Sequence, residues 1–441
     1  MKKLLPKILM SLLICLGLAT MLPAQTVISV AAGTDGIAGA LATAVDGDII
    51  ELTTSGGEYL EGATLTIVVK LTIRAKAGLA AKPVIRGGAA GTADVIVINK
   101  GGLTVKGVKF VGGQYVLKGQ TTEATGNPPD LSIKVYDCEF HKFEQRAIYT
   151  NSSCVYPFDS ILVKNSIFKD GVKQGLYLKS TRNDSNIFPG SYRYCKISNC
   201  LFVGLSSSSD GYPTYLEPGN RDVADKGWPT VIIDHSTADS CVYGFYTYTT
   251  PGALIQNCIV SNQTDPTRYC YGIESGRFTG APASTVKNSI YHKGSGVHPG
   301  NTFVASVIEN VDSIKPLYTN PAIGDYSLLA GSPGKAAGTD GKDLGYMPTT
   351  LPTDVRPAKI SLAPKIYPNP TLGPLRISLD EDITGASTLE IFDVTGKVVS
   401  KVRDLNGQRI VEIDLSSSPA GMYYGIVKDA NKTRTFKVIK K

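Results

Sequence analysis

The sequence has few charged residues, and little net charge outside its two ends. Charged residues make up 19% of the 441, and the formal net charge is +7. Three lysines in residues 1–24 and an excess of three basic residues from position 365 onward account for all but one of these charges. A nearly neutral central region lacks the basic surface that nucleic-acid-binding proteins use. We therefore expect no nucleic-acid partner.

Long hydrophobic runs are absent after the first 24 residues. The start, MKKLLPKILMSLLICLGLATMLPAQ, has a basic segment, a short apolar run and small residues before Gln25, which predicts an export signal over 1–24. A lipoprotein anchor at Cys15 is the alternative, which Ile14 disfavours because a small residue is expected there. No later segment reaches the ~18 apolar residues of a spanning helix, so we expect no transmembrane segment in the mature chain.

An eight-residue pattern recurs along the middle of the chain. Its copies are LTVKGVKF, IKVYDCEF, ILVKNSIF, CKISNCLF, VIIDHSTA, ALIQNCIV and STVKNSIY, and their starts are 30, 28, 34, 36, 22 and 31 residues apart. A period in the twenties to thirties is typical of a solenoid. Within each copy the apolar residues mostly alternate, and a Gly, Asp, Asn or His stands at the fifth position. The pattern predicts a short strand, a tight turn and a second short strand.

Stacked copies of this unit predict an all-β protein built as a right-handed parallel β-helix. Identical turns place like residues above like, so we expect Asn165 over Asn199 and Asn257 over Asn288. The eighth position predicts an interior stack of phenylalanines, namely Phe110, Phe140, Phe168 and Phe202.

The cysteines lack the spacing of a metal site. Neither CxxC nor HxxxH occurs, which argues against zinc. Cys138, Cys200 and Cys258 share the sixth position and alternate with serine, so they lie two rungs or ~9.6 Å apart, beyond the ~7 Å of a disulfide. We expect these to be packing thiols. Cys241 and Cys270 fall in adjacent coils, where a disulfide between them is an open alternative.

The two ends of the solenoid resemble those of secreted β-helix proteins. TVISVAAGTDGIAGALATAVDGDIIEL predicts a strand, a capping helix over the exposed first coil, and the pair Gly47-Asp48. PLYTNPAIGDYSLLAGSPGKAAGTDGKDLGY resembles a closing segment of the same group, which includes the polysaccharide lyases. The resemblance covers residues 26–346 and implies the fold more than an activity.

A Pro-rich linker, 347–364, separates this region from a second domain at 365–441. About seven short alternating segments there predict a small Ig-like β-sandwich. YPNP, VTGKVV and GMYYGIVKD…FKVIKK resemble the C-terminal sorting domain of type IX secretion cargo. The resemblance implies a Bacteroidota-type cell, type IX secretion machinery as the partner of 365–441, and a secreted or surface-attached protein. An ordinary carbohydrate-binding sandwich is the alternative.

A second strand follows each octet and carries tyrosine. If Ile148, Leu176, Phe245 and Ile273 point inward, strand alternation turns the following residues outward as one column. We expect this column to bind substrate, because Tyr rings stack on sugars and their hydroxyls form hydrogen bonds. An aromatic ladder that only stabilises the sheet is the alternative. The expected members are Tyr149, Tyr177, Tyr215, Tyr246 and Glu274.

The lyase resemblance implies a chemistry for the loops beside this column. Elimination from a uronic acid needs a base and a cation that neutralises the carboxylate. Lys179 is our candidate base, with Arg182 or Arg277 as the neutralising cation. No cofactor is certain, but Asp184, Glu217 and Asp222 could hold Ca²⁺. The alternative without catalysis is that these side chains are solvated or form ion pairs on the surface.

The histidines add little to the functional prediction. IIDHS, residues 232–236, is similar to the Asp-His motif of pectate lyases, but His235 occupies the turn position of the repeat, which explains it without catalysis. His141, His292 and His298 stand alone.

Two functions remain open. The first is an exported β-helix that binds an acidic polysaccharide, and in one version also depolymerises it. The second is a non-catalytic adhesin or structural rod.

Overall fold

The computed structural model divides the chain into two compact units, Met1–Leu351 and Pro352–Lys441. It describes residues 25–87, 93–120, 131–150, 154, 157–179, 192–217, 228–248, 250–273, 281–298, 306–348, 365–378, 387–394, 397–403, 405, 410–428 and 433–441. The expected export signal and most of the linker lie outside these residues.

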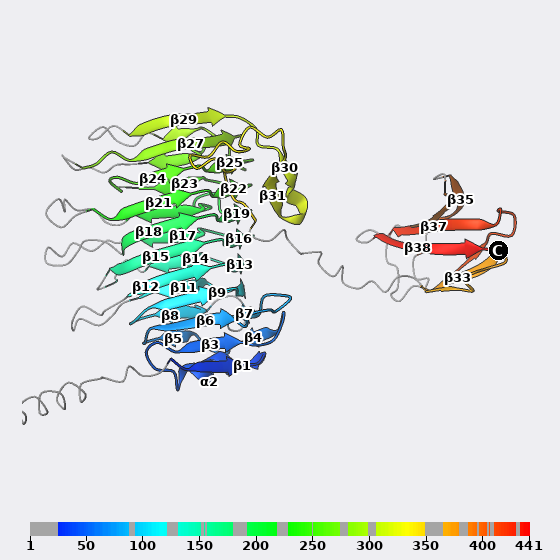
Figure 1. Ribbon diagram of the computed structural model, residues 1–441, viewed down its shortest axis with the longest axis horizontal. Coiled ribbons are helices and arrows are strands. Elements are labelled where there is room, and N and C mark those ends of the chain that lie inside the picture. Colours follow the sequence, from blue (N-terminus) through cyan, green and yellow to red (C-terminus); the bar gives the residue numbers. More distant parts are fainter. Residues whose placement is uncertain are drawn as a thin grey trace, which may run out of the picture. The chain divides into compact units, whose positions relative to one another are not determined.

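The first unit is the predicted parallel β-helix, in which each coil adds one strand to each of three parallel rows (Figure 1). Two rows form a 20-stranded sheet, which we call sheet A. Its first row is β1 (Val27–Val30), β3 (Ile49–Leu52), β6 (Leu71–Ala75), β9 (Leu103–Lys106), β12 (Ser132–Tyr136), β15 (Phe158–Lys164), β18 (Tyr192–Ser198), β21 (Thr230–Asp234), β24 (Leu254–Gln256), β27 (Thr285–His292) and β29 (Val307–Ser313).

The second row of sheet A follows the Asn turn in each coil, and β27 runs through both rows. This row consists of β2 (Gly33–Thr34), β4 (Glu58–Leu60), β7 (Val84–Arg86), β10 (Lys109–Val111), β13 (Glu139–His141), β16 (Ile167–Lys169), β19 (Leu201–Val203), β22 (Thr237–Asp239) and β25 (Ile259–Ser261). Sheet B is the third row, with nine strands: β5 (Leu65–Ile67), β8 (Ile96–Ile98), β11 (Tyr115–Gly119), β14 (Arg146–Thr150), β17 (Leu176–Lys179), β20 (Thr214–Glu217), β23 (Phe245–Thr247), β26 (Tyr271–Ile273) and β28 (Val297–His298).

The fifth position of every octet has left-handed backbone geometry. Its φ lies between 43° and 67° at Gly107, Asp137, Asn165, Asn199, His235, Asn257 and Asn288. Asn, Asp and Gly tolerate this conformation better than other residues do, which is why the sequence places them there. The predicted turn is therefore confirmed, and it allows successive coils to stack in register.

The interior is filled by the phenylalanines that the repeat predicts. Ring centroids are 5.1 Å apart between Phe110 and Phe140, 4.8 Å between Phe140 and Phe168, and 4.6 Å between Phe168 and Phe202, and all three pairs are stacked. All seven cysteines outside the export signal are free and buried, so the Cys241–Cys270 disulfide does not form. The alternation with serine has a physical reason, because Ser166, Ser236 and Ser289 accept the backbone N–H of Cys138, Cys200 and Cys258.

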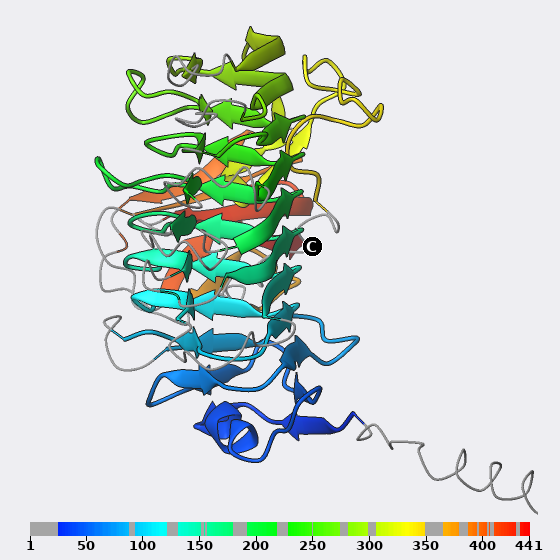
Figure 2. The same cartoon turned by 90° about the vertical axis from the view of Figure 1, so that its left-hand side faces the viewer.

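A short helix, α2 (Gly36–Leu41), closes the N-terminal end of the solenoid (Figure 2). Ile37 and Ala40 are buried against the first coil. The carboxylate of Glu61 accepts the backbone N–H groups of Ile37 and Ala38 at 3.0 and 3.1 Å, which satisfies donors that the first turn of a helix leaves free. The predicted capping helix is thus held in place by both packing and a carboxylate.

The segment 314–348, which we call the strap, packs on the outer side of the second row. It contains β30 (Tyr318–Asn320), the 3₁₀ turn η2 (Pro321–Ile323) and β31 (Asp325–Leu328), drawn in yellow beside the later coils in Figure 1. Leu328 and Leu344 cluster with Ile259 and Ile290, and Tyr326 and Tyr346 cluster with Leu201. The strap therefore covers the outward apolar side chains of this row.

The second unit is a two-sheet β-sandwich with its own core. One sheet has the order β32 (Lys365–Tyr367), β33 (Pro374–Ser378), β36 (Ile410–Asp414), and the other β35 (Val398–Arg403), β34 (Thr388–Phe392), β37 (Gly421–Lys428), β38 (Thr433–Lys440). All pairings in these sheets are antiparallel. Inward residues of both sheets, including Ile377, Ile391 and Val438, form one cluster.

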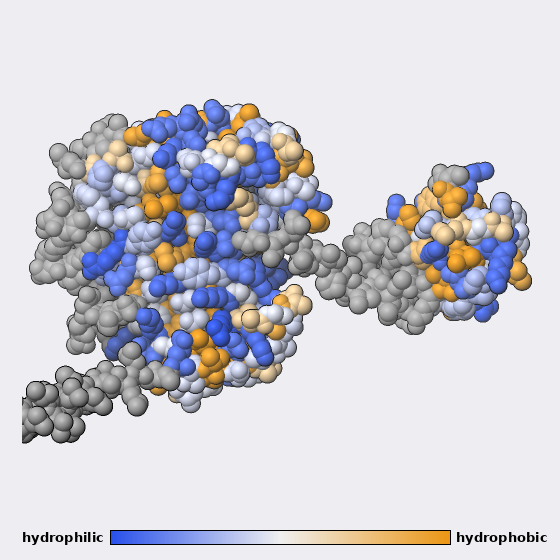
Figure 3. All heavy atoms as spheres, in the orientation of Figure 1, coloured by the Kyte–Doolittle hydropathy of each residue, from blue (hydrophilic) through white to orange (hydrophobic). Residues whose placement is uncertain are grey.

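The visible face of the β-helix mixes hydrophilic and hydrophobic side chains over its coloured, described residues (Figure 3). In the same part of the chain, no helix is long and apolar enough to cross a membrane.

Candidate functional site

The outer face of sheet B carries a column of tyrosines in register. Tyr149, Tyr177, Tyr215 and Tyr246 pair strand to strand along β14, β17, β20 and β23. On the side toward the N-terminus the next rung is Lys118 of β11. Each of these tyrosines is partly exposed, while its neighbours along the strand are buried. Strand alternation thus brings four phenols together that lie 28 to 38 residues apart in sequence.

The column does not continue to Glu274 as expected. Phe245 pairs with Tyr271 and not with Ile273, so the rung after Tyr246 is Gly272, and the next is His298. A Cβ on Gly272 would lie 2.2 Å from the ring of Tyr246, so that ring occupies the space above the glycine. Glu274 itself lies outside the described residues, as do Arg182, Asp184, Asp222 and Arg277.

The rings of this column lie against one another. Centroids are 6.0 Å apart between Tyr149 and Tyr177, 5.2 Å between Tyr177 and Tyr215, and 6.3 Å between Tyr215 and Tyr246. The pairs Tyr177–Tyr215 and Tyr215–Tyr246 are stacked, with interplanar angles of 14° and 5°, whereas Tyr149–Tyr177 is tilted by 43°. The rings therefore partly cover one another's faces.

A second group of aromatic residues widens this face. Tyr212 stacks on Tyr243 at 3.8 Å, and its edge meets Tyr215 and Tyr246 at 5.3 and 5.4 Å. Tyr115 stacks on Tyr149 at 4.7 Å. We call the combined surface the tyrosine face; it consists of Tyr115, Tyr149, Tyr177, Tyr212, Tyr215, Tyr243, Tyr246 and Tyr248.

The phenols of Tyr149, Tyr177, Tyr212 and Tyr215 stay protonated at neutral pH, because their pKa values are raised. Burial raises the pKa of Tyr149 and Tyr177 above the ordinary value. Burial, together with the neighbouring phenols and Glu217, raises the pKa of Tyr212 and Tyr215 further. A neutral phenol is both a hydrogen-bond donor and an acceptor. These groups are suited to binding hydroxyl groups and poorly suited to abstracting a proton.

Arg146, at the start of β14, lies over the tyrosine face. Its guanidinium carbon is 4.1 Å from the ring centroid of Tyr177, 4.9 Å from that of Tyr149 and 5.6 Å from that of Tyr115. Nε donates to Oε1 of Gln174 at 2.9 Å, and Nη1 donates to the hydroxyl of Tyr115 at 3.4 Å. A cation at this distance over an aromatic ring is attracted by the ring quadrupole.

Lys179, the candidate base, forms an ion pair with Glu217 on the neighbouring strand. Its Nζ lies 2.9 Å from Oε2 of Glu217, and the two residues are paired in register. Burial alone would lower the pKa of Lys179, but the adjacent carboxylate outweighs it and raises this pKa above the ordinary value. Lys179 is therefore an ammonium at neutral pH, which suits charge neutralisation better than proton abstraction.

The expected calcium ligands are represented here by Glu217 alone. Its carboxylate is already paired with Lys179 and the residue is only 7% exposed. Among the described residues, no three His, Cys, Asp or Glu side chains come together as a metal site. Asp184 and Asp222 lie outside the described residues, so the calcium site stays a prediction, and we derive no chemical step from this metal.

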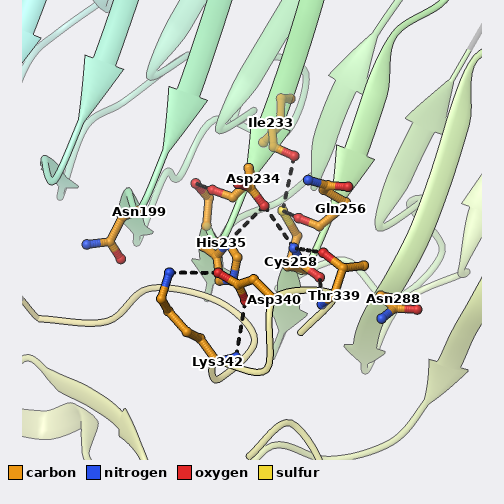
Figure 4. Close-up of polar contacts among 12 residues, drawn as sticks. Asn199, Ile233, Asp234, His235, Gln256, Cys258, Asn288, Thr339, Asp340 and Lys342 are labelled. Atoms are coloured by element: carbon orange, nitrogen blue, oxygen red, sulfur yellow. Dashed lines mark hydrogen bonds and ion pairs between the residues drawn. The ribbon is translucent and has the colours of Figure 1, made fainter. Parts of the chain in front are cut away.

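The Asp-His motif lies on another face, under the strap (Figure 4). Nδ1 of His235 lies 2.8 Å from Asp234, and Nε2 lies 3.2 Å from Asp340 of the strap, which is paired in turn with Lys342. His235 is 6% exposed and has left-handed geometry. The motif thus joins the turn to the strap, and it lies on sheet A, whereas the tyrosine face lies on sheet B.

Two other histidines have near neighbours. Nε2 of His141 lies 3.1 Å from Glu139, and His298 meets the edge of Tyr269 at a centroid distance of 4.6 Å. His298 is the rung of sheet B beyond Gly272, so it marks one end of the tyrosine face.

Sequence reasoning missed Arg146, Tyr115 and Tyr212. Strict alternation from Tyr149 points Arg146 inward, but two consecutive residues, Ala147 and Ile148, are buried, so both flanking residues face outward. The same pattern recurs in β11, where Val116 and Leu117 are buried between Tyr115 and Lys118. The signal that could have identified these residues is a polar or aromatic residue three positions before each column residue.

Comparisons with solved structures support the fold of the first unit. The chain is similar to the polysaccharide lyase family 6 alginate lyase AlyGC (16% identity, TM-score 0.49) and to an arginine-to-alanine variant of that enzyme (17% identity, TM-score 0.51). Each match covers 66% of this chain but only 40% of the solved chain. At this identity the likeness concerns the fold. No curated protein sequence matches the chain.

The second unit gives the clearer assignment. Its residues 365–441 match the family model described as a secretion system C-terminal sorting domain, from the first strand of the sandwich to the last residue. The chain is therefore a parallel β-helix that carries a C-terminal type IX sorting domain, which directs it to the cell surface or the extracellular space.

Proposed function

We propose that this exported β-helix binds an acidic polysaccharide across the tyrosine face of sheet B. The observation that carries the proposal is the in-register column of neutral phenols with the guanidinium of Arg146 beside it. At ~4.8 Å per rung, four rungs span about 14 Å, which is comparable with a short oligosaccharide. Hydroxyl groups at that spacing can form hydrogen bonds to successive sugars of one polymer.

The binding mode follows from the ring geometry. Because the rings stack on one another, sugar faces have little open aromatic surface to cover, and recognition rests on hydrogen bonds from the phenols and on charge from the cations. Such bonds are individually modest, about 1 kcal/mol each, so affinity requires several rungs together. Binding should therefore depend on oligosaccharide length.

Depolymerisation is the further step of this proposal. An alginate lyase shares the fold, and elimination from a uronic acid needs a cation at the carboxylate and a base at the adjacent carbon. Lys179 remains the candidate base, which takes the proton after losing its own, and in its charged form it is also a candidate for the cation. Arg182 and Arg277 remain candidates for the neutralising cation, and Glu217, Asp184 and Asp222 remain the residues to test for calcium.

The test of this step is a screen of uronate polymers for the absorbance of the unsaturated product, with and without calcium. Activity that falls strongly in Lys179→Ala supports a lyase. No new absorbance across the panel removes the lyase version and leaves binding.

A non-catalytic surface rod is the second candidate function. Mutual stacking of the tyrosines favours it, because a ladder of this kind stabilises a sheet without any ligand. A glycan array with the mature chain separates the two functions. Binding that Tyr177→Ala weakens supports the polysaccharide site, and an array without any bound glycan supports the rod.

A further inference from the structure

Arg146 differs from the other cations of the tyrosine face in its partners. Lys118 is paired with Asp94 at 2.9 Å and Lys179 with Glu217 at 2.9 Å. At the edges of this face, Lys173 lies 3.6 Å from Asp210, and Arg268 lies 3.0 Å from Asp265. The hydrogen bonds of Arg146 go to a neutral amide oxygen and a neutral phenol. Within the described residues it has no carboxylate partner within 4.0 Å.

The orientation of Arg146 is fixed by a buried glutamine. Gln174 is 1% exposed, and its Nε2 donates to Oδ1 of Asp210 at 3.1 Å. This bond turns the amide oxygen of Gln174 toward Nε of Arg146. The rings of Tyr149 and Tyr177 also contact the guanidinium group. The side chain is therefore preorganised, and little conformational entropy remains to be lost when a ligand binds.

Part of the guanidinium is left for a ligand. Of its five N–H donors, Nε and one on Nη1 are bonded to described residues, and the other three have no partner among those residues. A planar carboxylate matches two parallel N–H groups of a guanidinium, and such charge-assisted bonds are stronger than neutral ones. A partly buried cation without a counter-ion gains most from an anionic partner.

We propose that Arg146 is the specificity-determining residue of the tyrosine face and binds the carboxylate of one acidic sugar flanked by neutral sugars. This inference rests on the proposed function. The neighbouring rungs present neutral phenols, and their lysines are neutralised by Asp94 and Glu217. Because each ion pair carries no net charge, these two lysines attract a second and third anionic sugar less strongly than Arg146 does. The site thus fits a polymer with isolated acidic sugars better than an uninterrupted polyuronate.

The test is an array on which each acidic glycan is printed beside its carboxyl-reduced form, with homopolyuronates and sulfated glycans included. We expect the mature chain to prefer acidic glycans over their reduced forms by roughly 10- to 100-fold. Arg146→Gln should lower this preference to near one, because affinity for the acidic forms falls far more than affinity for the reduced forms. Arg146→Lys, which keeps the charge without the planar pair of donors, should keep an intermediate preference. Lys134→Gln, on the first row of sheet A, removes one positive charge away from the tyrosine face. This control should leave the preference for acidic glycans unchanged.

The contrary outcomes are distinct. An unchanged preference in Arg146→Gln overturns the inference, and an equal loss for acidic and reduced forms shows that Arg146 only supports the tyrosine stack. Homopolyuronates or sulfated glycans bound more tightly than isolated carboxylates overturn the single-carboxylate specificity. Absence of any glycan binding refutes the proposed function itself. Circular dichroism and thermal unfolding of each variant show that its fold is retained.

Discussion

Asn199 donates a hydrogen bond from Nδ2 to Oδ1 of Asn165, 34 residues earlier, at 2.9 Å. The two side chains belong to adjacent coils and occupy the same turn position. Asn199 also binds both backbone groups of Met347 in the strap, accepting its N–H at 2.6 Å and donating to its carbonyl at 2.8 Å. One side chain therefore joins the ladder to the strap.

Replacing Asn199 with alanine should destabilise the β-helix by about 3 kcal/mol, because three hydrogen bonds are lost and alanine is strained at φ 52°. Thermal unfolding of the mature chain measures this loss. Asn310→Ala is the matched control, since it has the same left-handed geometry but an exposed side chain bound only to Asn288 at the last turn. Equal melting temperatures for the two variants would contradict the role of Asn199.

The contact between His235 and the strap should weaken as pH rises. The hydrogen bond that His235 donates to Asp234 raises the pKa of His235 most, burial opposes it, and the charge of Asp340 adds to the rise. A histidine with a raised pKa in the folded state contributes stability fully below its unfolded pKa of ~6.5, and this contribution is lost as pH rises through the folded value. Asp234 and Asp340 have lowered pKa values and stay ionised in this range, and Lys342 stays charged.

Hydrogen exchange of residues 338–342 between pH 5.5 and 8 measures this effect. We expect slower exchange at pH 5.5 in the unmodified chain and no such dependence in His235→Asn, which retains a residue suited to left-handed geometry. The same pH dependence in both proteins, after correction for intrinsic exchange rates, would show that another group is responsible.

Removing Lys179 should lower the free energy of unfolding, because the nearly buried carboxylate of Glu217 then lacks a counter-charge. Lys179→Ala leaves Glu217 without its counter-charge, and we expect a loss of about 2 kcal/mol in the free energy of unfolding, less than for a fully buried pair because Lys179 is partly exposed. Lys179→Ala combined with Glu217→Gln should recover most of this loss. Chemical denaturation of the three proteins tests the coupling, and additive effects would argue that the pair is energetically unimportant.

Deleting residues 365–441 should abolish delivery of the β-helix to the cell surface or medium, since these residues match the sorting domain. Cell fractionation with an antibody against the β-helix measures the location. The truncated chain should accumulate in the periplasm. Deletion of residues 352–360, within the linker, should leave export intact. Export of the truncated chain would contradict the assignment.

Much of the fold could be predicted because its signals are local. The left-handed turn favours Gly, Asp or Asn, and Asn165 and Asn199 occupy such turns. Strand alternation places Phe168 inside the β-helix. Other left-handed positions gave no such signal: Lys142, Ser240 and Lys293 have φ of 54° to 56° between the second row and sheet B, although neither Lys nor Ser marks such a turn.

The candidate site was harder to predict because its geometry depends on register between distant strands. The loop before β26 does not repeat the spacing of earlier coils, so the sequence pattern predicted Ile273 opposite Phe245, whereas Tyr271 occupies that position. The pairing of Lys179 with Glu217 joins two residues to which the sequence suggested separate roles. Arg146 was hidden by the two consecutive buried residues after it.

The most direct test of the polysaccharide site is calorimetric titration of the mature chain with the acidic glycan that binds best, compared among three proteins. Tyr177→Ala removes the centre of the column, where the ring contacts Tyr149, Tyr215 and Arg146. Tyr136→Ala removes an equivalent partly exposed tyrosine on the first row of sheet A. We predict at least a tenfold loss of affinity in the first variant and none in the second, whereas equal affinity in all three folded proteins would contradict binding at the tyrosine face.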